Sequence, residues 1–451
     1  MGNNSMTSTS SANTAPTIID DMGIDALEVK ENTLYIDGCS TVELAKEYGT
    51  PLYVMSRNTI AAHCQELRDT WLGVYPNTKA CYASKAFLTL AMCKIIEAEG
   101  LSLDVVSGGE LYTAIKAEFP AERLEIHGNN KSYDELYMAI EYGVGHIIVD
   151  AYDELDIIED ICEKLGKTTK VLFRITPGVK VDTHEKIVTG AKGSKFGFPV
   201  ESDVLYPLFR QAMGSKYIEF RGIHFHVGSQ LFTNQSHLDA LEVALQILLR
   251  VKEDLGFTMP ELNLGGGFGI NYIKEDNRKS YAYFLDPMMK RVHAFCQENQ
   301  IDEPQIVIEP GRSIVGDAGI QLYTVGAIKE IKDLKTYVCI DGGMSDNIRP
   351  ALYDAKYEGI IADKASEPRS DIVTVAGKCC ESGDIIMKDV VLQRAERGDI
   401  LAVLSTGAYG YSMASNYNKL TKPAVVLADN GDSRLIVKRQ SYEDLISLEV
   451  L

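Results

Sequence analysis

The chain has 451 residues, of which 45% are hydrophobic and 24% charged, the composition of an ordinary globular protein with room for two substantial cores. Its formal net charge of −19 argues against nucleic acid as a partner, because the phosphates would be repelled. No run of about 18 apolar residues is present, so we expect no membrane partner either.

The cysteines and residues 1–20 give indications of the compartment in which the protein is located. Nine cysteines without a CxxC pair or a Cys/His cluster predict reduced thiols of a cytoplasmic protein, and no metal site. Residues 1–20 are rich in Ser, Thr and Asn and lack the basic and apolar segments of a signal peptide. We expect them to form a disordered tail.

Strand-like segments follow this tail within residues 21–55. The segments ALEVKENTLYIDG and PLYVMS are rich in residues that favour strands. We expect both to join a second, β-rich domain before the chain enters the main one.

Residues 56–312 alternate between strand-like and helix-like segments. Apolar residues recur at helical spacing in stretches such as 132–143, 153–165 and 236–255. Strand candidates begin at residues 79, 102, 124, 146, 170, 220, 261 and 305, and the first five starts are 22 to 24 residues apart. Because parallel strands need crossover helices, eight such strands predict a (β/α)8 TIM barrel, with a doubly wound open sheet as the alternative.

The pattern changes after Arg312. In residues 313–451 apolar and polar residues alternate, and Gly and Asp mark the turns, as in half-buried strands. We expect a mostly β C-terminal domain, built like a β-barrel or sandwich, that also takes up the N-terminal strands. The predicted fold class is therefore α/β, a TIM barrel with an additional β domain.

Polar residues or glycines follow every predicted barrel strand. Because the carboxyl ends of barrel strands meet at one mouth, their recurrence at all eight strands predicts a shared polar cavity. These residues are Lys85, Ser107, Gly108, Gly109, Glu110, His127, Gly128, Asn129, Asp150, Arg174, Thr176, His226, Gly228, Ser229, Gly265, Gly266, Gly267, Glu309 and Arg312.

Lys85 is the candidate for covalent chemistry. In CYASKA it shares a strand face with residues 81 and 83, so we expect its amine to point into the mouth. A buried lysine loses its charge readily and can form a Schiff base. A surface lysine that keeps its amine in solvent is the alternative.

Three further features suit an anionic aromatic ligand. The N–H groups of Gly265–Gly267 can approach a phosphate, with the Ser229 hydroxyl nearby, although a plain tight turn has the same sequence. His226 lies flat on an aromatic ring or is an ordinary core histidine. Glu309 is costly to bury unpaired, so it faces either a protonated ring nitrogen or a basic side chain such as Arg312.

Ten ordered segments carry a family resemblance that spans the chain from about residue 24. They are YASKA, SLDVVSGGEL, HGNNKS, SKFGF, HFHVGSQ, GGGFG, EPGR, IRPALY, CESGD and GAYGYSMASNYN. The chain resembles the fold-type III pyridoxal-phosphate decarboxylases, and within them the branch that acts on diaminopimelate.

The resemblance implies a role for each matching residue. Lys85 would hold pyridoxal 5'-phosphate as a Schiff base, His226 would stack on its ring, and Glu309 would pair with the ring nitrogen. Further cofactor contacts would come from Ser229, Gly266, Gly267, Arg312 and Tyr409. The substrate contacts would come from Arg312, Arg349, Tyr353, Glu381 and Tyr409. Cys380 would be a catalytic residue contributed across the interface of a homodimer with two shared sites.

The resemblance also implies a reaction, the conversion of meso-2,6-diaminopimelate to L-lysine and CO2, which is the last step of lysine biosynthesis. Arg312 and Arg349 suit this substrate because a guanidinium binds a carboxylate bidentately, and diaminopimelate retains one that lysine and ornithine lack. A decarboxylase for D-lysine, D-ornithine or another basic amino acid is the nearest alternative.

Two more distant alternatives are a racemase and an inactive binding homologue. Racemases on this barrel place an arginine at the ring nitrogen, so Glu309 argues against the first. Inactive homologues lose the Schiff-base lysine or the acid, so Lys85 and Glu309 together argue against the second.

Overall fold

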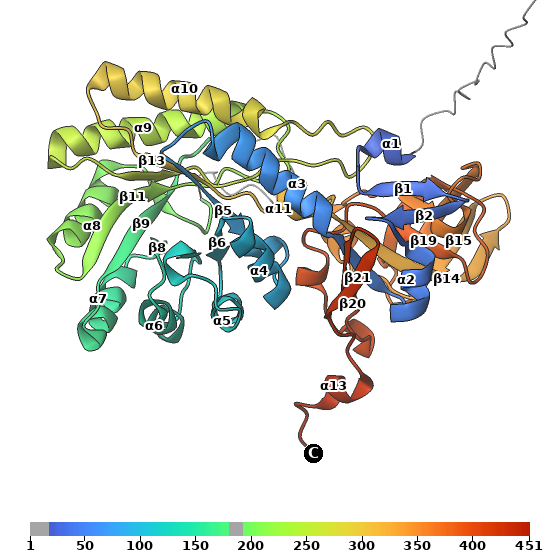
Figure 1. Ribbon diagram of the computed structural model, residues 1–451. Coiled ribbons are helices and arrows are strands. Elements are labelled where there is room, and N and C mark those ends of the chain that lie inside the picture. The colour runs from blue at the N-terminus through green and yellow to red at the C-terminus, as the bar shows by residue number, and fades with distance from the viewer. Residues whose placement is uncertain (1–17, 180–192) are drawn as a thin grey trace, which may run out of the picture.

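The computed structural model describes residues 18–179 and 193–451. Two parts lie side by side, a barrel of strands and helices and a second domain made mainly of strands (Figure 1). None of the helices in the described ranges has the length and hydropathy needed to cross a membrane.

The barrel is closed, and its strands run parallel. They are β5 (Thr78–Ala83), β6 (Ser102–Val105), β7 (Leu124–Ile126), β8 (His146–Val149), β9 (Thr169–Thr176), β11 (Ile218–His224), β12 (Glu261–Asn263) and β13 (Gln305–Ile308). Strand β13 pairs with β5 and β8 pairs with β9, which completes the ring. The predicted TIM barrel is confirmed, and the open sheet is excluded. A two-residue strand, β10 (Phe198–Pro199), adds to β9 outside the ring.

Helices cover the outside of the barrel (Figure 1). They are α3 (Arg57–Leu67), α4 (Leu90–Ala98), α5 (Gly108–Lys116), α6 (Tyr133–Tyr142), α7 (Glu154–Leu165), α8 (Ser202–Gly214), α9 (Gln235–Leu255) and α10 (Tyr281–Asn299). Local sequence sets their ends. Helix α6 begins with a capping box between Ser132 and Glu135, and it ends at Gly143 in the left-handed conformation.

The second domain is built on strands from both ends of the chain. They are β4 (Leu52–Ser56), β14 (Gly319–Ile331), β15 (Lys335–Ile340), β16 (Gly359–Ile361), β17 (Asp371–Ala376), β18 (Ile385–Leu392), β19 (Ile400–Val403), β20 (Ala424–Asp429) and β21 (Asp432–Val437). Strand β4 pairs antiparallel with β14 and parallel with β20. The segment PLYVMS therefore belongs to the C-terminal sheet, as predicted.

The residues before β4 form a small unit beside that sheet. Strands β1 (Leu27–Lys30), β2 (Thr33–Ile36) and β3 (Cys39–Ser40) make a three-stranded antiparallel sheet, which α2 (Thr41–Tyr48) follows. Helix α1 (Ile18–Met22) buries Ile18 and Ile19 in a core shared with β4 and β14. The predicted tail of residues 1–20 thus overlaps an ordered helix at its end, and residues 1–17 lie outside the described part. The domain boundaries at residues 55 and 312 stay predictions.

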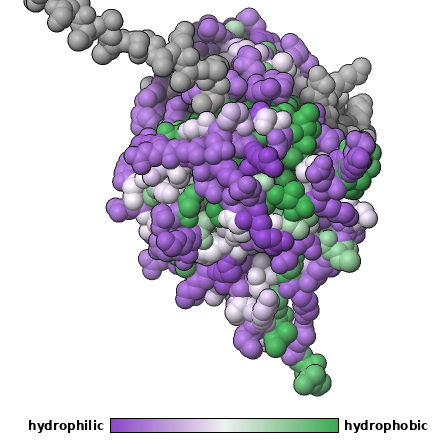
Figure 2. All heavy atoms as spheres, turned by 90° about the vertical axis from the view of Figure 1, so that its right-hand side faces the viewer, coloured by the Kyte–Doolittle hydropathy of each residue, from purple (hydrophilic) through white to green (hydrophobic). Residues whose placement is uncertain are grey.

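Three short helices complete the chain: α11 (Arg312–Val315), α12 (Arg349–Tyr353) and α13 (Tyr442–Ile446). The segment that contains α13 projects from the body of the molecule (Figure 1). Its end exposes Leu448, Val450 and Leu451, and the tip is hydrophobic in a view whose surface is otherwise mostly hydrophilic (Figure 2).

Candidate active site

A cavity of about 670 Å³ lies at the carboxyl ends of the barrel strands. The barrel and the second domain both line it. Among the lining residues are Lys85, His226, Ser229, Gly267, Glu309, Arg312, Arg349, Tyr353 and Tyr409. The structure therefore brings most of the residues singled out in the sequence into one space.

Lys85 reaches this cavity by a route that strand periodicity did not predict. Strand β5 ends at Ala83, and Lys85 lies in a short 3-10 turn, Ser84–Ala86, so the alternation of residues 81, 83 and 85 does not apply. The turn is held at both ends. The Ser84 hydroxyl donates to Glu110 Oε2 at 2.8 Å, and the Tyr409 N–H donates to the Ala86 carbonyl at 2.8 Å.

His226 is held by the glycine-rich loop. The Gly266 N–H donates to His226 Nδ1 at 3.2 Å. Burial holds the pKa of His226 well below its usual range, so the ring is neutral. Gly266 itself does not line the cavity, and a Cβ there would lie 2.0 Å from the Glu309 carbonyl oxygen. Close packing against the end of β13 therefore requires this glycine.

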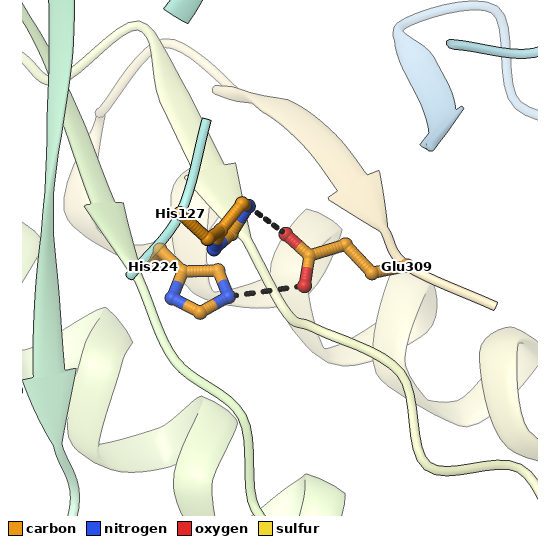
Figure 3. Close-up of side chains that lie close together, drawn as sticks. All are labelled: His127, His224 and Glu309. Atoms are coloured by element: carbon orange, nitrogen blue, oxygen red, sulfur yellow. Dashed lines mark hydrogen bonds and ion pairs between the residues drawn. The ribbon is translucent and has the colours of Figure 1, made fainter. Parts of the chain in front are cut away.

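Glu309 is the centre of a buried cluster (Figure 3). Its carboxylate lies 3.1 Å from His127 Nε2 and 3.2 Å from His224 Nε2, and it accepts a 2.7 Å hydrogen bond from Asn263. A salt bridge to Arg312, which the sequence left open, is not what pairs it. The three donor atoms of His127, His224 and Glu309 lie within 4.8 Å of one another, a grouping that a metal ion could also use and that the sequence did not indicate.

The charges in this cluster follow from burial and from these contacts. Burial alone would raise the pKa of Glu309, but His224 and His127 hold it well below its usual range. Burial alone would lower the pKa of His127, but Asp104 and Glu309 raise it. Burial lowers the pKa of His224 to about 4 and raises that of Asp104 to about 7. Glu309 is therefore an anion that forms a hydrogen bond with a neutral His224 and lies in ion-pair contact with His127, whose protonated form it favours.

Two buried guanidinium groups also line the cavity. Arg312 donates to the Tyr272 hydroxyl and, at 3.0 Å, to Ser229 Oγ. Arg349, at the start of α12, donates to the Tyr357 hydroxyl. Within residues 18–179 and 193–451, neither arginine forms an ion pair with a carboxylate, and Arg312 Nε has no hydrogen-bond partner. Such a pair of buried cations is suited to an anionic ligand.

Cys380 and Glu381 lie elsewhere. Both are exposed and neither lines the cavity of its own chain. The Cys380 N–H donates to Asn418 Oδ1 at 2.6 Å, and the Tyr417 hydroxyl donates to Glu381 at 3.5 Å. The loop that carries them therefore faces outward, beside residues 417 and 418.

Several residues that line the cavity or contact its lining were missed or left without a role by the sequence reasoning. His127 and Arg174 were noted only as strand-end residues, and His224 only as part of the segment HFHVGSQ. Tyr272 and Tyr357 gave no signal, because each lies in a loop whose path the sequence does not reveal. Asn263, at the last position of β12, could have been found from its place one residue before LGGG.

The fold and this constellation of lysine, carboxylate and histidine at a barrel mouth define a class, the pyridoxal-dependent decarboxylases. Residues 59–316 match the family model described as pyridoxal-dependent decarboxylase, pyridoxal binding domain. This match covers the barrel and ends just past Arg312.

Individual relatives narrow the class. The diaminopimelate decarboxylase of Bacillus subtilis is 46% identical over 417 residues, which cover 92% of this chain and 95% of that protein. The crystal structure of diaminopimelate decarboxylase from M. jannaschii in complex with L-lysine has a TM-score of 0.89 and 35% identity, and covers 95% of this chain and 99% of that one. The Helicobacter pylori enzyme, also with L-lysine, has a TM-score of 0.82 and 30% identity over 90% of this chain and 98% of its own. The chain belongs to the diaminopimelate decarboxylase family.

Proposed function

We propose that the protein converts meso-2,6-diaminopimelate to L-lysine and CO2 with bound pyridoxal 5'-phosphate, as the last step of lysine biosynthesis. The observation that carries this proposal is the pair of guanidiniums, Arg312 and Arg349, which form no ion pair with a carboxylate of the described residues and lie in the same cavity as Lys85 and Glu309. An amine, an anion and two cations without a carboxylate partner among the described residues suit a substrate that keeps one carboxylate while it loses another.

The cavity fits the cofactor at each of its functional groups. Lys85 supplies the amine that would hold the aldehyde. Ser229, Gly267 and Tyr409 would hold the phosphate, and the buried Arg312 Nε, without a partner among the described residues, leaves this guanidinium for the retained carboxylate. When bound, the cofactor's ring accepts the electron pair left after loss of CO2.

Glu309 and His226 would set the electrostatics around that ring. An anionic Glu309 stabilises a proton on a facing nitrogen, and its contacts with His127 and His224 keep it ionised. His226 is neutral, so the imidazole face beside the cofactor ring is uncharged. A cationic imidazole at this place would oppose the proton on the ring nitrogen. Both roles, that of Glu309 and that of His226, are part of the proposal.

Substrate orientation would come from the two arginines of the cavity. Arg349 and Arg312 would bind the retained carboxylate, and Tyr353 lies at the end of the same helix as Arg349. The carboxylate that leaves would do so without a cation beside it, because an ion pair would stabilise the ground state.

Cys380 and Glu381 would act in the cavity of a second copy of the chain. Both are exposed on this one, and the adjoining C-terminal segment exposes apolar residues, which supports a homodimer with shared sites. Cys380 would protonate the carbon that has lost CO2, and Glu381 would bind the distal ammonium. We further propose a cytoplasmic location, and no nucleic-acid or membrane partner.

The first test is release of CO2 from meso-diaminopimelate, with and without added pyridoxal phosphate, compared with D-lysine and D-ornithine. We expect cofactor-dependent release from diaminopimelate and formation of L-lysine. Faster release from a D-amino acid would favour the alternative decarboxylase, and inversion without CO2 would favour a racemase. Lys85→Ala should lose both activity and the visible absorbance of bound cofactor.

Subunit mixing tests the shared site. Lys85→Ala and Cys380→Ala chains should each be nearly inactive alone. Mixed and reassembled, they should recover about one quarter of wild-type activity, because half of the dimers hold one intact site of two. No recovery would mean that Lys85 and Cys380 act within one chain, and full activity of Cys380→Ala alone would mean that Cys380 does not act at all.

A further inference from the structure

Two tyrosines that the sequence did not predict as site residues, Tyr272 and Tyr357, contact the guanidinium groups of Arg312 and Arg349. We propose that they are positioning residues that set substrate preference. They hold Arg312 and Arg349 with neutral groups, and so leave both cations available for the second carboxylate of a dicarboxylic amino acid. This inference rests on the proposed function and names the residues that shape its carboxylate subsite.

Tyr272 touches both arginines. Its hydroxyl accepts a hydrogen bond from Arg312 Nη1. The guanidinium carbons of Arg349 and Arg312 lie 4.5 and 5.5 Å from the centroid of its ring. The side chain is only 6% exposed, so it is fixed by its surroundings. A single buried ring therefore sets the spacing of the two cations.

Tyr357 holds the second arginine from another direction. Its hydroxyl accepts from Arg349 Nη1, and its ring packs edge-on against Tyr272, with centroids 5.4 Å apart and an interplanar angle of 88°. Burial raises the pKa of Tyr357, so the hydroxyl stays neutral. The two tyrosines and two arginines form one packed unit, which we call the guanidinium cluster.

The neutrality of the tyrosines is what matters for binding. A glutamate or aspartate in the same positions would also hold an arginine, but it would cancel the charge and compete with a substrate carboxylate. A hydroxyl and a ring face stabilise a buried guanidinium while its charge remains. Among the described residues Arg349 donates only the hydrogen bond to Tyr357, so its other N–H groups are available to a ligand.

The guanidinium cluster also explains how a monocarboxylate would be disfavoured. D-lysine would leave two desolvated cations without an anion, whereas meso-diaminopimelate supplies one. Sites built from buried polar groups reject analogues that leave those groups unpaired more strongly than apolar pockets reject a missing methylene.

Conservative variants of the cofactor-loaded protein test the proposal. Tyr357→Phe removes the acceptor of Arg349, Tyr272→Phe removes that of Arg312, and Tyr272→Leu also removes the shared ring. Tyr142→Phe is the matched control, since that hydroxyl donates to the Phe119 carbonyl at 2.8 Å, on the outside of the barrel. The measurements are KM and kcat for meso-diaminopimelate, and the inhibition constants of pimelate and of cadaverine, which has no carboxylate.

We expect each Tyr→Phe variant to raise KM and the pimelate inhibition constant by about tenfold, the usual cost of one hydrogen bond to a charged group. The kcat should change less than KM, the cadaverine constant should stay near that of wild type, and Tyr272→Leu should be the most affected. Equal loss of affinity for both inhibitors would indicate a merely structural role and overturn the proposal. So would variants that match Tyr142→Phe. If wild type does not decarboxylate diaminopimelate, the proposed function fails, while the two inhibitors still test the cluster by themselves.

Discussion

The backbone N–H of Gly266 and Nδ1 of His226 form a 3.2 Å hydrogen bond at the mouth of the barrel. Because Nδ1 is the acceptor, the proton of the neutral imidazole must be on Nε2. The same glycine lies against the carbonyl of Glu309. Gly266 therefore contacts both the His226 ring, which faces the cavity, and the end of the strand that carries Glu309.

Gly266→Ala should disturb this arrangement. Its Cβ would lie 2.0 Å from the Glu309 carbonyl oxygen and 2.8 Å from the carbonyl carbon, so the backbone must shift. We expect a loss of stability of about 1–3 kcal/mol, as for other overpacked positions, and weaker cofactor binding. Thermal unfolding and a pyridoxal-phosphate titration measure the two effects. Gly214→Ala is the control, since no atom lies within 4 Å of its added Cβ, and it should behave as wild type.

Glu309→Gln should separate charge from shape. The amide keeps the volume of the side chain but cannot carry the negative charge that His127 and His224 support. We expect kcat to fall by about 100-fold, the order seen when one preorganised electrostatic contact is removed, and the absorbance of bound cofactor to shift. The exposed pair of Glu303 with His293 supplies the control, Glu303→Gln. Wild-type kcat in Glu309→Gln would rule out a role for the charge.

Acid stability should depend on Glu261, at the opposite end of the barrel from the cavity. Burial would raise its pKa, but His146 at 3.0 Å and Arg221 at 2.7 Å hold the pKa at about 2 instead of 4.5. A carboxyl whose pKa is depressed by folding contributes stability above its unfolded pKa, and that stability is lost as the pH falls through the folded value. The contribution is about 3 kcal/mol at most, from roughly 2.5 pH units at 1.36 kcal/mol each.

The measurement is the free energy of unfolding between pH 5 and pH 3 for wild type and Glu261→Gln. Wild type should lose stability more steeply on acidification, since only its unfolded chain takes up a proton at position 261 in this pH range. Parallel curves would show that Glu261 does not carry this dependence.

Ser132→Ala tests a local determinant of the barrel. The Ser132 hydroxyl accepts from the Glu135 N–H, and the Glu135 carboxylate accepts from the Ser132 N–H in return. Loss of this cap should destabilise the protein by about 1 kcal/mol without changing KM, because α6 lies on the outside of the barrel. Ser366→Ala, at an exposed serine outside any helix cap, should leave the unfolding midpoint unchanged.

Much of the architecture was predictable from local pattern. Eight strand starts, the helices between them and the return of PLYVMS to the C-terminal sheet follow from apolar periodicity and turn residues, which act over a few positions. The pattern failed at Lys85, because the strand ends at Ala83 and a 3-10 turn, not strand alternation, directs the side chain. It also missed the order in Ile18 and Ile19, whose burial depends on contacts far along the chain.

The sequence by itself determined the class of fold and the family and predicted the roles of Lys85, Glu309 and the arginines, since residue types and ordered motifs are properties of the chain alone. Only the tertiary structure decided which side chains contact each charged group. Glu309 meets His127 and His224, and Arg312 and Arg349 meet Tyr272 and Tyr357, because barrel closure and the second domain bring together residues from different strands and loops. Electrostatic pairing acts over a few ångströms in space, and distance along the chain does not reveal it.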